Sequence, residues 1–127
     1  MQAAQNIPRR ILVVDDEPLV GDAIKRILES EKHQVQTATS SQAGLAAFAE
    51  AKFDLIILDY DLPLMKGDKV AAAIKQQSPA QPVMMVTAYG EALRFGGSFP
   101  LGVDLVLTKP FDSREFLDAV RRLTVAQ

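Results

Sequence analysis

The sequence predicts an α/β fold in which helices cover both faces of a doubly wound, five-stranded parallel sheet. Three observations support this fold class. Short apolar runs alternate along the chain with longer segments whose apolar residues recur at helical spacing. The short runs are continuous, as strands buried on both faces require, and several stop directly on a polar residue. The length of 127 residues and the 48% hydrophobic content fit one domain with its own core.

The first half of the chain predicts two strand–helix units. Residues 11–14 form an apolar run that ends in acids, and Pro18 then precedes a helix whose apolar positions over 19–28 have helical spacing. A weaker strand over 35–38 leads through two serines, both suitable N-caps, into an alanine-rich helix that ends near Ala51.

The second half repeats this order. Residues 55–58 form the clearest apolar run, and a loop marked by Pro63 separates it from a helix with Val70 and Ile74 on one face. A Ser-Pro pair ends that helix, and residues 83–86 form the next buried strand.

The last strand and the last helix close the chain. Residues 105–107 are the final apolar run. Asp112 and Glu115 have the spacing of a capping box, which predicts the start of a helix that buries Phe116 and Val120.

Composition excludes several classes of protein. The 14 basic and 16 acidic residues are mixed along the chain, with no basic stripe to neutralise a phosphate backbone, so we expect no direct nucleic-acid binding. The absence of cysteine excludes thiolate sites and fits a reducing compartment, so the expected location is the cytoplasm. No stretch approaches the roughly 18 apolar residues of a membrane span, so we expect no membrane contact, and residues 1–10 do not resemble a signal peptide.

Polar side chains follow four of the five predicted strands. Asp15 and Asp16 follow the first strand, Asp59 the third, Thr87 the fourth, and Lys109 comes just after the fifth. These residues should meet at the carboxyl edge of the sheet, where ligands bind in such folds. Three neighbouring carboxylates repel one another unless they hold a proton or a cation, and an oxygen-only ligand set favours Mg²⁺ or Mn²⁺. With a lysine and a threonine opposite, the set predicts a phosphoryl-transfer site.

The sequence resembles the receiver domains of response regulators over residues 10–123. The resemblance implies a flavodoxin-like fold with strand order 2-1-3-4-5, an N-terminal extension (1–9), a receiver domain (10–124) and a C-terminal tail (125–127). The motifs that carry it are residues 11–17 (ILVVDDE), 54–59 (DLIILD), Leu62-Pro63 with Gly67, 86–88 (VTA) and 108–111 (TKPF).

The resemblance also implies roles in a phosphorelay. Asp59 would accept a phosphoryl group from the phosphohistidine of a sensor histidine kinase or a histidine phosphotransfer protein. Asp16 would bind Mg²⁺ directly, Asp15 would assist through water, and the Asp61 backbone carbonyl would complete the protein ligands. The chain would then be no enzyme beyond catalysing its own phosphorylation and dephosphorylation.

Further roles follow for residues around the acceptor. Thr87 would contact the phosphoryl oxygen and switch with it, Ala88 would keep the entrance small, and Lys109 would pair with the phosphate. The Lys109–Pro110 bond would be cis, which requires proline at that position. Asp61 and Tyr89 would flank the path of the attacking water and set the lifetime of the phosphate.

Two features depart from the family pattern. The position three before Lys109, usually an aromatic that swings inward with the threonine, is Val106, and we expect Tyr89 to be a rim residue that shapes access. Glycines and a proline crowd residues 90–102, so the fourth helix should be short or irregular and limited to about 91–95.

Two alternatives remain open. Asp59-Tyr60-Asp61 also fits the signature of haloacid-dehalogenase-type phosphatases, although that family places its second acid pair after the lysine, whereas Asp15 and Asp16 come first here. A binding module that works without phosphorylation is the other alternative. The output partner stays unknown, the chain could stand alone or belong to a longer protein, and His33 is expected at the surface.

Overall fold

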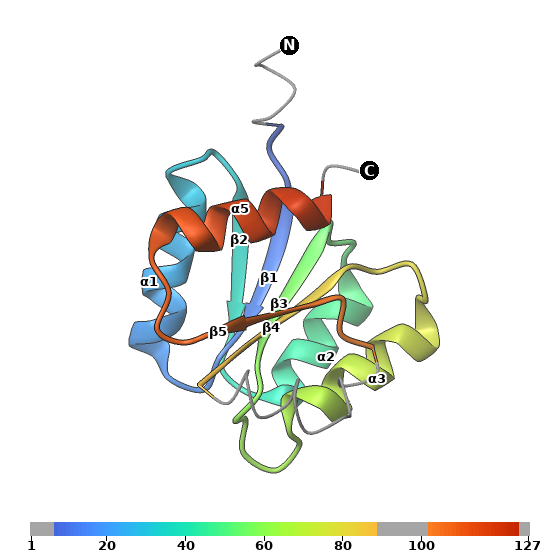
Figure 1. The fold of residues 1–127 in the computed structure, drawn as a ribbon. Coiled ribbons are helices and arrows are strands. Elements are labelled where there is room, and N and C mark those ends of the chain that lie inside the picture. Colours follow the sequence, from blue (N-terminus) through green and yellow to red (C-terminus); the bar gives the residue numbers. More distant parts are fainter. Residues whose placement is uncertain (1–6, 89–101, 125–127) are drawn as a thin grey trace.

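A computed structural model describes residues 7–88 and 102–124. The described residues form one parallel sheet in the order β2-β1-β3-β4-β5, which confirms the predicted fold class and strand order (Figure 1). The fourth helix expected over 91–95 falls outside the described residues. The elements are β1 (Arg10–Val14), α1 (Pro18–Glu29), β2 (Gln34–Ala38), α2 (Ser41–Glu50), β3 (Leu55–Asp59), α3 (Gly67–Gln77), β4 (Val83–Thr87), β5 (Leu105–Thr108) and α5 (Ser113–Thr124).

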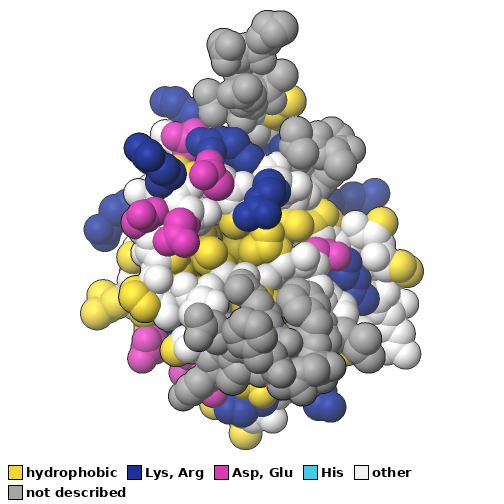
Figure 2. Space-filling view, in the orientation of Figure 1, with side chains coloured by type: hydrophobic (Ala, Val, Ile, Leu, Met, Phe, Trp, Pro, Cys, Tyr) yellow, Lys and Arg dark blue, Asp and Glu magenta, His cyan; other side chains and the backbone are white. Residues whose placement is uncertain are grey.

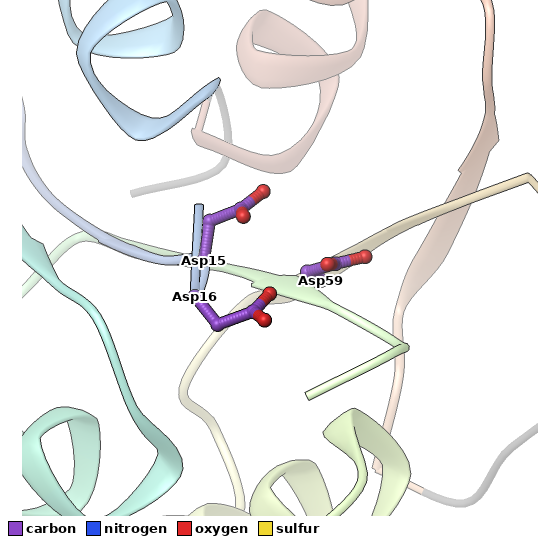
Figure 3. A group of neighbouring side chains, drawn as sticks. All are labelled: Asp15, Asp16 and Asp59. Carbon is purple, nitrogen blue, oxygen red and sulfur yellow. The ribbon is translucent and has the colours of Figure 1, made fainter. Parts of the chain in front are cut away.

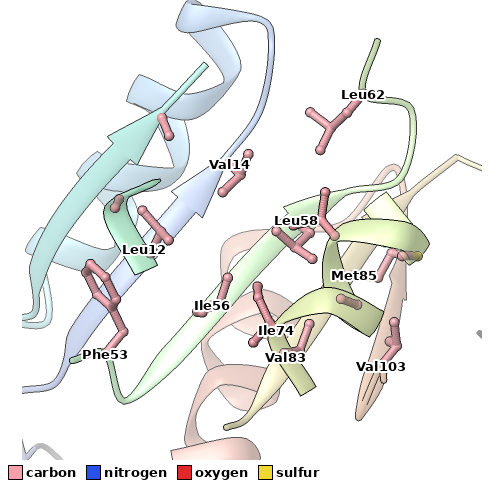
Figure 4. Close-up of a cluster of buried hydrophobic side chains, with 14 of the residues drawn as sticks. Leu12, Val14, Phe53, Ile56, Leu58, Leu62, Ile74, Val83, Met85 and Val103 are labelled. Atoms are coloured by element: carbon pink, nitrogen blue, oxygen red, sulfur yellow. The ribbon is translucent and has the colours of Figure 1, made fainter. Parts of the chain in front are cut away.

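Side chains of the central strands alternate between two hydrophobic clusters, one on each face of the sheet. Leu12 and Leu58 belong to the cluster on the α2 and α3 side, and Ile11 and Ile57 belong to the cluster on the α1 and α5 side. Figure 4 shows the first of these, with Ile74 of α3 among the residues drawn against the sheet. Because both faces are covered, β3 and β4 are buried along their whole length, as their continuous apolar runs predict.

Local sequence signals explain where the helices begin. Pro18 is the first residue of α1, where the missing N–H is not needed. The Ser40 hydroxyl caps α2 by accepting the Ala43 N–H at 3.0 Å. The predicted capping box is confirmed, because Glu115 N–H donates to the Asp112 carboxylate at 2.8 Å and Asp112 N–H donates back to the Glu115 carboxylate at 3.3 Å.

Three strands run one residue beyond their predicted apolar runs, and the added residue is polar in each case. β3 ends at Asp59, β4 at Thr87 and β5 at Thr108. Asp59 pairs with Val86, and Thr87 pairs with Thr108. The ladder continues because its hydrogen bonds use the backbone, as when Tyr60 N–H donates to the Val86 carbonyl at 3.1 Å. The sheet itself therefore holds these polar side chains.

Candidate functional site

Three aspartates meet at the carboxyl ends of β1 and β3. Asp15 and Asp16 follow β1, Asp59 is the last residue of β3, and their side chains gather in one place (Figure 3). One carboxylate oxygen from each residue lies within 4.8 Å of the others. Asp15 and Asp59 are 4% and 9% exposed, and Asp16 is more open to solvent. The topology thus brings together the residues that the sequence predicts as an acidic cluster.

The electrostatics of the cluster favour a bound cation. Burial raises the pKa of the Asp15 carboxyl, and the neighbouring carboxylates of Asp59 and Asp16 raise it further. The Glu17 N–H, which donates to Asp15 Oδ1 at 2.9 Å, and the Lys109 ammonium act in the opposite direction. The carboxylates repel one another, they offer only oxygen ligands, and one of them is open to solvent. Such a cluster fits a hard divalent ion.

A lysine ammonium and a backbone N–H also approach the Asp59 carboxylate. Lys109 Nζ lies 3.6 Å from Asp59 Oδ1, and Asp61 N–H points to the same oxygen at 3.4 Å. Lys109 is brought there by the end of β5, where its own N–H donates to the Thr87 carbonyl at 2.9 Å. The Lys109–Pro110 peptide bond is cis.

A cleft of about 230 Å³ opens over these side chains. It brings together expected site residues from the ends of β1, β3, β4 and β5, although Asp15 is not among those that line it. Glu17 also lines this cleft, and its only signal in the sequence is that it directly follows the acid pair. The lining residues are Asp16, Glu17, Asp59, Asp61, Thr87, Ala88 and Lys109.

Gly67, the first residue of α3, packs directly on the backbone of Asp59. A β-carbon at position 67 would lie 2.4 Å from the Asp59 carbonyl oxygen and 2.9 Å from Tyr60 Cα. The Gly67 N–H also donates to the Tyr60 carbonyl at 2.9 Å. The start of α3 is therefore held against the residue that carries the central carboxylate.

The two residues expected at the switch differ in how far the structure describes them. Val106 is 4% exposed and belongs to the cluster on the α2 and α3 side, where it pairs with Met85. Tyr89 lies outside the described residues, so its rim position stays a prediction.

The profile of the response regulator receiver domain matches residues 11–121 of this sequence. The chain belongs to the response regulator receiver family. Receiver domains act in phosphorelay signalling, so the predicted family and class of function are confirmed. Neither alternative, a phosphatase or a module independent of phosphorylation, finds support in these comparisons.

Curated relatives and solved structures agree with this membership. The receiver domain is 34% identical over 115 residues to the transcriptional regulatory protein PcoR of Escherichia coli, covering 91% of this chain and 51% of PcoR. It is 37% identical over 116 residues to the DNA-binding dual master transcriptional regulator RpaA of Synechocystis, covering 90% and 48%. The response regulator TrrA of Thermotoga maritima, solved with Mg²⁺-BeF, is 30% identical with a TM-score of 0.83, covering 91% and 98%.

The chain spans about half the length of the curated relatives that it matches. Those names conflict with the expectation of no nucleic-acid partner, since RpaA is described as DNA-binding and PcoR as a transcriptional regulator. The expectation was based on charge, and acidic and basic side chains intermix on the face of the receiver domain shown in Figure 2. Among the described residues, no helix is long and apolar enough to cross a membrane.

Proposed function

We propose that Asp59 accepts a phosphoryl group from the phosphohistidine of a sensor histidine kinase or a histidine phosphotransfer protein. One observation carries the proposal. Carboxylate oxygens of Asp15, Asp16 and Asp59 lie within 4.8 Å of one another, and the Lys109 ammonium lies 3.6 Å from Asp59 Oδ1. A carboxylate next to both a cation site and an ammonium can be both nucleophile and phosphate carrier.

In the proposed reaction, a carboxylate oxygen of Asp59 attacks the phosphorus atom of the donor. An O–P bond forms, the N–P bond to the donor imidazole breaks, and the electron pair leaves with that nitrogen, which takes up a proton. Lys109, already paired with Asp59, holds one phosphoryl oxygen, and the Thr87 hydroxyl donates to another. Ala88, which has a small side chain and lines the cleft, would keep the entrance small.

The metal that fits the donor set is Mg²⁺, with Mn²⁺ as a substitute. Asp16 and Asp59 would hold it directly, Asp15 through water, and the Asp61 backbone carbonyl would add a further oxygen. Bound there, the ion offsets the negative charge of the acids and of the phosphoryl oxygens. The all-oxygen cluster and the raised pKa of Asp15 support this choice.

Switching would run from the phosphoryl group through Thr87 and Lys109, which share the β4–β5 edge of the cleft. We place the receiver domain at residues 10–124, the span from the first residue of β1 to the last of α5. The absence of cysteine fits a reducing compartment, so we propose that the protein works in the cytoplasm.

The test is phosphorylation by a small donor. Purified protein, Mg²⁺ and acetyl phosphate should yield a chain heavier by one phosphoryl group in intact mass spectrometry. Asp59→Asn, which keeps the size of the side chain, should gain nothing, and EDTA should abolish the gain on the wild type. A wild-type chain that stays unmodified under conditions in which another receiver domain is phosphorylated would refute the proposal.

A further inference from the structure

An ion pair stands at the mouth of the cleft. Lys66 Nζ lies 2.9 Å from Asp61 Oδ1, and the two side chains are 53% and 51% exposed. Asp61 lines the cleft and follows the proposed nucleophile by two residues, whereas Lys66 is the residue before α3. The pair therefore bridges the two ends of the loop that connects β3 to α3.

Backbone contacts at the end of this loop hold the Lys66 backbone in place, and with it the start of the Lys66 side chain. Gly67 donates its N–H to the Tyr60 carbonyl at 2.9 Å and approaches the Asp59 carbonyl so closely that a β-carbon would clash. Lys66 Nζ also lies 5.9 Å from the centre of the Tyr60 ring. The ammonium is thus placed beside Asp61 by the same contacts that hold Asp59.

Acidic residues outnumber basic residues around the cleft, so the position of the Lys66 ammonium matters for the charge at its entrance. Of the residues lining it, Asp16, Glu17, Asp59 and Asp61 are acidic, and Lys109 is the base. Any phosphodonor brings further negative charge into this space. A bound divalent ion and Lys109 would offset the charge of the acids inside the cleft. The Asp61 carboxylate stands at the entrance, where it would repel the donor and could rotate inward.

We propose that Lys66 is a positioning residue for phosphoryl transfer. It holds the Asp61 carboxylate away from the cleft and offsets its charge, which speeds the entry of anionic phosphodonors. The inference rests on the proposed phosphorylation of Asp59 and adds a role for a residue that does not line the cleft. Because the pair is exposed, its effect should weaken as salt screens the charges.

The test is a double-mutant cycle on the initial rate of phosphorylation by acetyl phosphate, measured by intact mass at low ionic strength. Lys66→Met keeps most of the alkyl chain and removes the charge. It should slow the reaction roughly two- to fivefold, the range that exposed ion pairs support. Lys66→Arg should restore most of the rate, and added salt should narrow the difference between Lys66→Met and the wild type.

The second arm of the cycle separates positioning from simple attraction. In an Asp61→Asn background, which keeps the backbone carbonyl, Lys66→Met should leave the rate unchanged. Lys69→Met, which removes the same charge from an exposed position in α3, is the matched control and should match the wild type. Equal rates for Lys66→Met and the wild type, or equal slowing with and without the Asp61 carboxylate, would overturn the inference. Phosphorylation of the wild type is read in the same experiment, so failure of the proposed function would be distinguished.

Discussion

A β-carbon at Gly67 would collide with the backbone of the proposed nucleophile. In Gly67→Ala the new atom would lie 2.4 Å from the Asp59 carbonyl oxygen, 2.9 Å from Tyr60 Cα and 3.1 Å from the Asp59 carbonyl carbon. The shortest of these is 1.0 Å below the 3.4 Å at which ordinary contact begins. All three neighbours are backbone atoms, so no side chain can rotate to relieve the contact.

The loss of stability in Gly67→Ala depends on which backbone segment moves to relieve the clash. β3 is held by its ladder to β1 and β4, so the start of α3 must shift outward and weaken the 2.9 Å hydrogen bond from Gly67 N–H to the Tyr60 carbonyl. Overpacking costs about 1–3 kcal/mol, and the backbone origin of the clash puts this case near the upper end. A weakened hydrogen bond adds up to about 1 kcal/mol. We expect a loss of about 3 kcal/mol in the free energy of unfolding, or roughly 10 °C in Tm.

Urea unfolding monitored by circular dichroism measures this loss, and the acetyl phosphate assay should show slower phosphorylation. Gly21→Ala is the matched control, since Gly21 lies in the first turn of α1 and a β-carbon there meets nothing within 4 Å. It should stabilise the protein by about 0.5–1 kcal/mol, because alanine restricts the unfolded chain and favours helix. A Gly67→Ala protein as stable as the wild type would refute the close approach between α3 and Asp59.

Three further predictions concern polar groups that are wholly or partly buried. The pKa of the Asp15 carboxyl is raised, so its charge destabilises the metal-free fold increasingly as pH rises through that pKa. Asp15→Asn in EDTA should therefore raise Tm at pH 7. An unchanged or lower Tm would contradict this. His33, expected at the surface, is partly buried; its Nδ1 accepts the Arg9 N–H at 2.9 Å, and burial lowers its pKa. Stability from this group is complete above the ordinary pKa of about 6.5 and is lost as pH falls through the lowered value; urea midpoints should fall between pH 7.5 and 5.5, and less so in His33→Gln. Thr108 Oγ1 is buried with no hydrogen-bond partner in the described part of the chain. Thr108→Val should therefore raise the free energy of unfolding by about 1 kcal/mol, measured as a higher urea midpoint. A lower midpoint would mean that the hydroxyl has a hydrogen-bond partner.

The fold could be predicted from the sequence because its signals are local. A continuous apolar run means a strand buried on both faces, and a serine or an Asp–Glu pair at the right spacing means the start of a helix. The cleft could be predicted in outline for a related reason: parallel strands end at one edge, so polar residues at Asp59 and Thr87 had to meet there. The ends of the strands were less accessible, since backbone pairing continues under polar side chains.

What the sequence determined by itself was therefore the order of the elements, the two-sided burial of the sheet and the acids that converge on Asp59. Only the tertiary structure decided what lies against that residue. The contact of Gly67 with the Asp59 carbonyl and the pairing of Lys66 with Asp61 depend on the path of one loop and the docking of α3. Such contacts leave no periodic pattern in a chain, because they arise from the packing of elements and not from the local preferences of residues.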